Sequence, residues 1–156
     1  AGKTFNIAGL NCSYAITSNS DMKKAFDREC QKREIHSVNV FGYTALEAAY
    51  KYGEAWLEDL KEYLQENIDF TKAYLAKSKI DFINPEATYL LWLSFKNYTI
   101  CHKEVKQKLL KESKVALNDG ISFGKEGNSY FRLNIALPRK NLELALSKIV
   151  TNFDQI

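Results

Sequence analysis

A single long apolar stripe constrains the fold of this chain more than any other feature. Hydrophobic residues recur at spacings of three and four between positions 46 and 68, which places them on one face of an α-helix. Gly53 interrupts the stripe, and a glycine inside a helix costs about 1 kcal/mol relative to alanine. We therefore expect a bend or a close helix contact at this position. A helix of this length is more than one small domain needs, so we predict that it bridges two domains.

The residues after the stripe predict β-strands. Segments 79–83 and 87–95 are rich in β-branched and aromatic residues, and a turn sequence at 84–86 separates them. Farther along, the segment YFRLNIAL alternates between apolar and other residues, so that Phe131 and Arg132 lie on opposite faces of a strand.

The remaining periodic segments complete the predicted fold. Residues 11–17 read as a short strand, and helices are expected at 21–33, at 102–113 and after Pro138. The fold class is therefore α+β, in which helices pack on a small, mostly antiparallel sheet.

Composition excludes several classes of function. The 22 basic and 19 acidic residues are interspersed and leave a net charge of +3, which is no footprint of nucleic-acid binding or of a polybasic membrane segment. No apolar run is long enough to cross a bilayer. Three widely spaced cysteines (Cys12, Cys30 and Cys101) favour reduced thiols over a disulfide framework or a metal site. We expect a cytoplasmic protein with no nucleic-acid or membrane partner.

Lys3 is the first candidate for chemistry. It follows Gly2 and precedes Thr4, like the end of a P-loop, but the next residues include two asparagines and a glycine and would form a poor helix. A lysine in a glycine-bearing loop can instead form a Schiff base with a carbonyl cofactor and then move a proton. Judged by composition alone, a lysine near a terminus is usually a solvated charge.

Arg132 is the second candidate. It lies in the middle of a predicted strand, opposite the apolar face, and a planar guanidinium can hold the carboxylate of an amino acid through two hydrogen bonds. The alternative is a surface arginine on the solvent side of the sheet. His36 and His102 have no carboxylate or cysteine at ligand spacing and are interpreted as structural. Trp92 is interpreted as a core or interface residue.

Four segments together resemble one enzyme family. They are GKTFNIAGL, FGYTALEAAYKYGEAWLEDLKEYLQEN, PEATYLLWLSF and VALNDGISFGKEGNSYFRLNIALPRKNLELAL. Their order and spacing are similar to those in the C-terminal halves of class I/II aminotransferase-like, fold-type I enzymes that depend on pyridoxal 5'-phosphate (PLP). The nearest branch is that of the cystathionine β-lyases, or C–S β-lyases. The resemblance implies that Lys3 is the catalytic lysine that binds PLP as a Schiff base. It also implies that Arg132 binds the α-carboxylate of an amino-acid substrate.

The resemblance also implies an organisation for the chain. Residues 1–50 would be the C-terminal remnant of the PLP-binding large domain, and residues 51–156 the C-terminal small domain. We expect the chain to be the C-terminal part of a longer, homodimeric enzyme and to be inactive by itself. Many aminotransferases of this class carry an arginine eight residues after the lysine, but this sequence has Asn11 there. This departure favours the lyase branch.

Three alternatives remain open at this stage. The first is an aminotransferase built on the same scaffold. The second is a non-catalytic module that binds a protein partner through the apolar stripe of residues 46–68. The third is a regulatory role for an aminotransferase-like protein.

Overall fold

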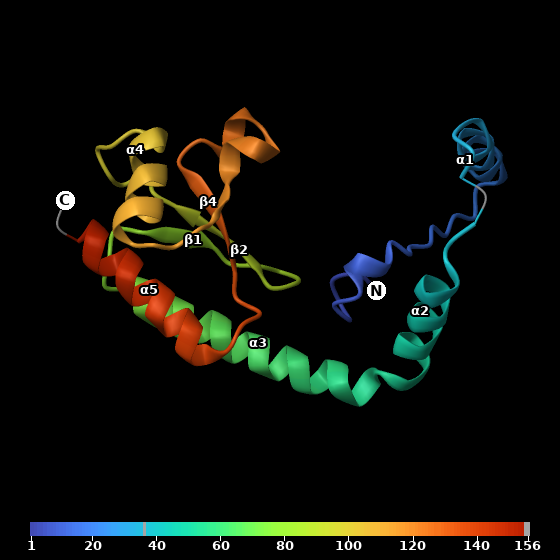
Figure 1. Ribbon diagram of the computed structural model, residues 1–156, viewed down its shortest axis with the longest axis horizontal. Coiled ribbons are helices and arrows are strands. Elements are labelled where there is room, and N and C mark those ends of the chain that lie inside the picture. Colours follow the sequence, from blue (N-terminus) through green and yellow to red (C-terminus); the bar gives the residue numbers. More distant parts are fainter. Residues whose placement is uncertain (36, 155–156) are drawn as a thin grey trace. The chain divides into compact units, whose positions relative to one another are not determined.

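The computed structural model describes residues 1–35 and 37–154, which form two compact units divided between Asp59 and Leu60 (Figure 1). The boundary falls inside helix α3 (Glu54–Leu75), so one continuous helix contributes to both units. The assignment of the first unit to a PLP-binding domain, with a boundary at residue 50, stays a prediction.

The first unit is largely helical. It contains a short 3-10 turn, η1 (Ala8–Leu10), followed by α1 (Ser20–Lys32) and α2 (Val40–Tyr52). The side chain of Asn19 starts α1 by accepting hydrogen bonds from two backbone N–H groups of the first turn. The predicted strand at 11–17 is wrong, because no described segment pairs with these residues, and a strand needs a partner for its backbone groups.

The long apolar stripe is carried by two helices instead of one. α2 ends at Tyr52 and α3 begins at Glu54, so the expected interruption at Gly53 is confirmed. A Cβ atom at Gly53 would lie 2.5 Å from the carbonyl oxygen of Ala49 and 2.8 Å from Cε1 of Phe5. Glycine is needed here because a backbone carbonyl and an aromatic ring occupy the space of a side chain.

The second unit contains a four-stranded sheet. Its strands are β1 (Asp81–Ile83), β2 (Leu90–Ser94), β3 (Asn118–Asp119) and β4 (Tyr130–Asn134), in the spatial order β1-β2-β4-β3. All neighbouring strands are antiparallel, which confirms the predicted fold class. The sequence did not predict β3, which is only two residues long and lies inside a glycine-rich segment. The two 3-10 turns η3 (Gly120–Phe123) and η4 (Lys125–Gly127) follow it.

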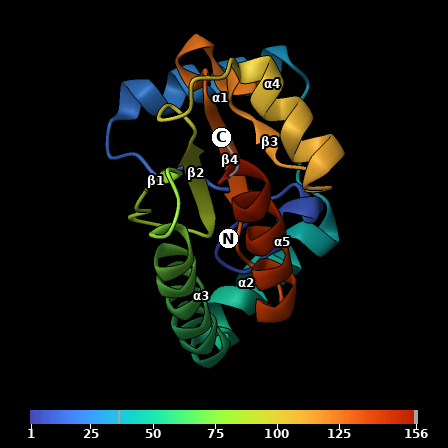
Figure 2. The ribbon, with the colours of Figure 1, turned by 90° about the vertical axis from the view of Figure 1, so that its left-hand side faces the viewer.

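Helices cover one face of this sheet. α3 and α5 (Arg139–Phe153) lie side by side along it, and α4 (His102–Gln107) continues into a π-helical turn at Lys108–Glu112 (Figure 1, Figure 2). Every described residue of the hydrophobic core belongs to this unit, including Leu64, Leu91, Leu93, Leu109, Phe131, Leu133, Leu142, Leu146 and Phe153. Burial of their apolar surface is the main source of the unit's stability.

Cys12, Cys30 and Cys101 are free, so they form no disulfide. Within residues 1–35 and 37–154, no helix combines the length and the apolar character that crossing a bilayer requires.

Candidate functional site

The backbone around Lys3 forms a closed turn, in which the N–H of Phe5 donates to the carbonyl of Ala1 at 2.9 Å. The side chain of Lys3 is exposed. Among the described residues, no hydrogen bond or ion pair engages its amine. The amine is therefore accessible for a covalent bond to a carbonyl group.

Aromatic contacts fix this lysine turn to the helices of the first unit. The ring of Phe5 packs edge-on against Tyr50 with a centroid distance of 5.3 Å and stacks on Trp56 at 6.2 Å. At the other end of the loop, Nδ2 of Asn39 donates to the carbonyl of Leu10 at 2.8 Å. The loop that carries Lys3 is thus attached near both ends of α2.

Asn11 has a local structural reason to be an asparagine. It ends η1 in the left-handed backbone conformation, with φ of 50° and ψ of 43°. Asparagine adopts this conformation more readily than most non-glycine residues. An arginine at this position would add backbone strain to its charge.

Arg132 lies on the sheet face opposite the buried core. Along β4, Phe131 and Leu133 are buried while Arg132 is half-exposed, as the alternation predicted. Across the sheet, Arg132 pairs with Trp92 on one side and with Asn118 on the other. The outer face therefore carries a row of chemically distinct side chains.

One nitrogen of the Arg132 guanidinium is hydrogen-bonded and another has no partner among the described residues. Its Nη2 donates to Oδ1 of Asn118 at 3.2 Å, and its carbon lies 4.5 Å from the ring centroid of Phe123. Its Nε is buried and has no hydrogen-bond partner within the described chain. A buried donor without an acceptor is energetically costly, so the unpaired Nε is an unusual feature of the outer face.

A charged network supports the strand beside Arg132. The carboxylate of Asp119 accepts from Lys106 Nζ at 2.8 Å, from His102 Nε2 at 2.8 Å and from the N–H of Ile121 at 3.0 Å. The pKa of Asp119 is lowered to about 2. The main cause is the hydrogen bond from the Lys106 ammonium, and His102 and the backbone N–H of Ile121 lower the pKa further. Because Nδ1 of His102 accepts from the N–H of Ser129 at 2.9 Å, His102 joins α4 to the segments on both sides of the η3–η4 region.

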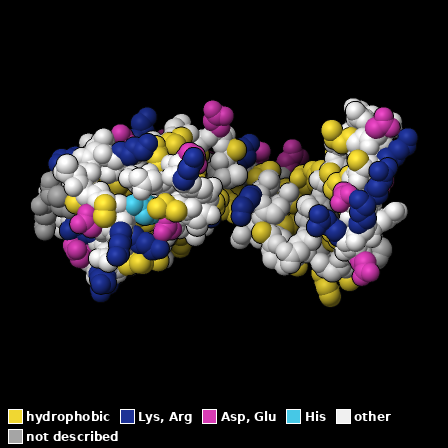
Figure 3. Space-filling view, turned by 90° about the horizontal axis from the view of Figure 1, so that it is seen from above, with side chains coloured by type: hydrophobic (Ala, Val, Ile, Leu, Met, Phe, Trp, Pro, Cys, Tyr) yellow, Lys and Arg dark blue, Asp and Glu magenta, His cyan; other side chains and the backbone are white. Residues whose placement is uncertain are grey.

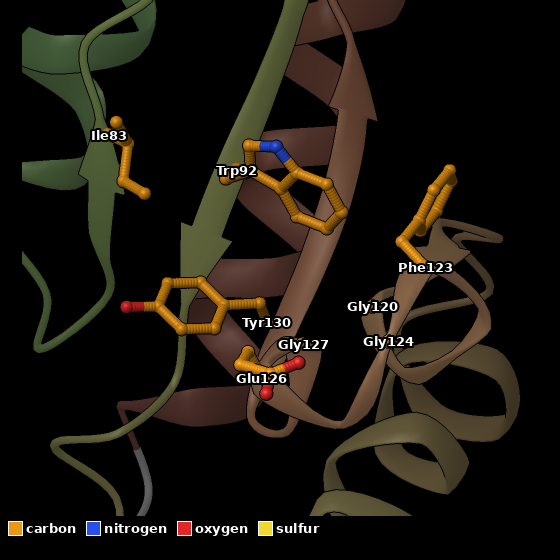
Figure 4. Close-up of a pocket in the computed structure, with 8 residues that line it drawn as sticks. All are labelled: Ile83, Trp92, Gly120, Phe123, Gly124, Glu126, Gly127 and Tyr130. Carbon is orange, nitrogen blue, oxygen red and sulfur yellow. The ribbon is translucent and has the colours of Figure 1, made fainter.

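A shallow cavity of about 300 Å³ lies on the outer sheet face. Figure 4 shows the indole of Trp92 between the side chains of Ile83 and Phe123, with Tyr130 and Glu126 at another side of the cavity. The rings of Trp92 and Phe123 are almost perpendicular, at 88°, with a centroid distance of 5.2 Å.

The predicted site residues fall into different units. Lys3 belongs to the first and Arg132 to the second, so neither unit alone contains both. Trp92 is half-exposed on the outer face and does not belong to the core. Its alternation with Leu91 and Leu93 could have predicted this position, whereas Phe123 lies in a turn without periodicity and gave no signal. His36 lies outside the described residues. Among residues 1–35 and 37–154, no cluster of potential metal ligands occurs.

The first unit exposes many hydrophobic side chains. They include Tyr14, Ile16, Met22, Phe26, Phe41, Tyr43, Tyr52 and Trp56. Figure 3 shows hydrophobic side chains, in yellow, on one face of this unit. The only buried residue among the described residues of this unit is Gly42. These residues therefore form no core of their own.

Comparisons with known proteins identify several similar chains. The chain is 36% identical to cystathionine β-lyase PatB of Bacillus subtilis (strain 168), over 94% of this chain and 38% of that relative. A PLP-bound structure from Clostridium difficile 630, described as an aminotransferase, superposes with a TM-score of 0.90 and 42% identity, over 97% of this chain and 40% of that chain. Cystalysin from Treponema denticola, whose structure contains pyridoxal 5'-phosphate, gives a TM-score of 0.88 at 26% identity, over 99% of this chain and 40% of that one.

The matches also define what the chain represents. It spans about 40% of the length of these relatives. The model of one protein family, described as aminotransferase class I and II, matches residues 1–149. The chain therefore belongs to the class I and II aminotransferase family.

Proposed function

We propose that the chain acts as the C-terminal part of a PLP-dependent C–S β-lyase that cleaves cystathionine or another cysteine S-conjugate. The observation that carries this proposal is the guanidinium of Arg132, whose buried Nε lacks an acceptor. This donor and the neighbouring Nη groups fit the α-carboxylate of an amino acid. The similarity to a cystathionine β-lyase supports the type of reaction.

The residues of this chain also fit the cofactor. Lys3 has an exposed amine that no described group engages, which suits a covalent Schiff base to the PLP aldehyde. With Asn11 in a left-handed turn, the phosphate charge would be met by groups other than this residue. When bound, PLP supplies the electron sink that makes removal of a proton from the substrate Cα feasible.

The roles of Lys3 and Arg132 follow from their chemistry. Arg132 would hold the substrate carboxylate and so fix the orientation of the bond between Cα and its hydrogen. Once the substrate amine has displaced it from the cofactor, Lys3 would accept the Cα proton on Nζ. The bond between Cβ and sulfur then breaks, and its electron pair leaves with the sulfur. With one water consumed, the products are a thiol, pyruvate and ammonia.

An aminotransferase is the second candidate, because the family model that matches the chain is named for that activity. The discriminating assay supplies the holoenzyme with a cysteine S-conjugate, either cystathionine or S-benzyl-cysteine, and measures pyruvate and thiol in the absence of a keto acid. The lyase proposal predicts steady release of both. Amino transfer that requires a keto acid and outpaces thiol release would favour the aminotransferase.

Two further expectations belong to this proposal. We expect the enzyme to be a homodimer, which light scattering of the holoenzyme would test. We also expect it to work in the cytoplasm, where its three unpaired cysteines would stay reduced.

A further inference from the structure

The outer sheet face holds a cavity to which the proposed reaction assigns no role. It measures about 300 Å³ and lies entirely within the second unit. Its described lining residues are Ile83, Trp92, Gly120, Phe123, Gly124, Glu126, Gly127 and Tyr130. Most of these side chains are aromatic or aliphatic, which suits an uncharged apolar group.

The cavity adjoins Arg132 through two aromatic residues. Trp92 stands directly opposite Arg132 in the sheet register. Phe123 contacts both, since its ring lies 4.5 Å from the guanidinium carbon and 5.2 Å from the indole centroid. A molecule whose carboxylate is bound at Arg132 can therefore extend an apolar group past Phe123 into the cavity.

The wall that carries Phe123 is preformed. A Cβ atom on Gly120 would overlap the carbonyl of Gly127, and a Cβ atom on Gly127 would overlap the backbone of Gly120. The two glycines thus let the ends of the segment pack backbone against backbone. The side-chain carboxylate of Asp119 also accepts from the N–H of Ile121. Binding at this wall would need little ordering of the protein.

A negative charge at the rim of the cavity disfavours ligand groups that carry a carboxylate. Glu126 is the one charged residue among the described lining residues. Its carboxylate is exposed and lies 4.0 Å from Lys125 Nζ. A carboxylate on the ligand would meet this like charge, whereas an uncharged ring would not.

We propose that this cavity is the subsite for the group beyond sulfur in a cysteine S-conjugate, and that Trp92 and Phe123 make it selective for aromatic and other uncharged apolar groups. This inference rests on the proposed lyase function and on the binding of the substrate carboxylate at Arg132. It identifies a substrate class within that function, in which cystathionine, whose group beyond sulfur carries a carboxylate, would be a poorer substrate than S-benzyl-cysteine.

The test compares two cysteine S-conjugates, S-benzyl-cysteine and S-methyl-cysteine, in the holoenzyme. The dissociation constant and kcat/KM are measured for each compound, and each quantity is expressed as the ratio between the benzyl and the methyl compound. A change at the carboxylate site affects both compounds equally, so a change in these ratios reports on the cavity. Phe123→Ala should reduce the preference for the benzyl compound by about tenfold. Phe123 is 53% exposed, so the substitution leaves the core intact. Trp92→Leu is the second variant and should act in the same direction.

Ile121→Ala is the matched control. Ile121 lies in the same 3-10 turn as Phe123 and is 48% exposed, but it does not line the cavity. It should leave both ratios unchanged. Ratios that are unchanged in Phe123→Ala and Trp92→Leu, or equally changed in Ile121→Ala, would overturn the proposal.

The charge preference has its own test. Glu126→Gln should raise kcat/KM for S-(2-carboxyethyl)-cysteine several-fold relative to kcat/KM for S-benzyl-cysteine. An unchanged ratio of the two values would contradict the proposed repulsion between Glu126 and a ligand carboxylate. If the wild-type holoenzyme released no thiol from any of these compounds, the lyase function would fail. The ratios of dissociation constants would still decide whether the subsite exists.

Discussion

The guanidinium of Arg132 lies over the ring of Phe123, 4.5 Å from its centroid. The ring covers one face of the guanidinium, while Asn118 binds one of its terminal nitrogens. The buried Nε is left without a partner among the described residues. In the proposed role of Arg132, this arrangement would orient a fork of donors before a ligand arrives, which would reduce the cost of binding a carboxylate.

Replacement of Arg132 tests this role in the holoenzyme. Arg132→Ala should raise KM for an amino-acid substrate by about 10- to 150-fold, because a hydrogen bond to a charged group is worth about 1.5–3 kcal/mol. Arg132→Lys should recover only part of the affinity, since an ammonium cannot form the paired hydrogen bonds of a guanidinium. Arg28→Ala, on the exposed surface of α1, is the control. An Arg132→Ala enzyme with unchanged substrate affinity would rule out the assignment.

Asn67 should be critical for stability. It is fully buried, and its Nδ2 donates to the carbonyl of Ile135 at 2.8 Å while its Oδ1 accepts from Arg139 Nε at 2.6 Å. Asn67→Ala should lower the free energy of unfolding by about 2–4 kcal/mol, because buried partners are left unpaired. Urea denaturation would measure this. The exposed neighbour Gln65, changed to alanine, should cost less than about 0.5 kcal/mol, and equal losses in the two variants would contradict this prediction.

Acid sensitivity should depend on Asp119. Its pKa is lowered to about 2 in the folded protein and returns to its ordinary value near 3.8 on unfolding. The stabilisation is therefore complete above about pH 4 and is lost as the pH falls toward 2. Asp119→Asn should reduce the free energy of unfolding by up to about 2 kcal/mol at pH 7, with the difference from wild type vanishing near pH 2. A difference that stays constant from pH 7 to pH 2 would refute this linkage.

The break between α2 and α3 gives a prediction that opposes helix propensity. Alanine normally stabilises a helix relative to glycine, but Gly53→Ala should destabilise by about 1–3 kcal/mol through contact with Phe5 and the carbonyl of Ala49. Gly9→Ala is the control, because a Cβ atom there meets no atom within 4 Å. Thermal unfolding distinguishes the two. A Gly53→Ala protein as stable as Gly9→Ala would show that the space beside Gly53 is not restrictive.

Much of the second unit was predictable from periodicity. The alternation in β4 correctly placed Phe131 in the core and Arg132 on the outer face, because a strand has a side-chain period of two. The stripe of α5 was equally informative, since Leu142, Leu146 and Phe153 are all buried. Such patterns extend over several residues and are reinforced by core burial.

The features that failed or were missed depend on contacts distant in sequence. The segment 11–17 has the composition of a strand, but no partner strand lies beside it among the described residues. β3 is defined by its pairing with β4, and Phe123 by its contact with Arg132. Neither the pairing nor the contact leaves a periodic signal in the local sequence. The close approach of Phe5 to Gly53 is of the same kind, although the glycine itself marked the position.

The most direct test of the lyase proposal concerns Lys3. Lys3→Ala in the holoenzyme should lower kcat for pyruvate release from a cysteine S-conjugate by about 10³-fold or more, because one residue would both hold the cofactor and move the Cα proton. Lys3→Arg should be equally inactive, since it keeps the charge but not the nucleophilic amine. Lys24→Ala, on the surface of α1, should keep wild-type activity. Substantial pyruvate release by Lys3→Ala would contradict the account.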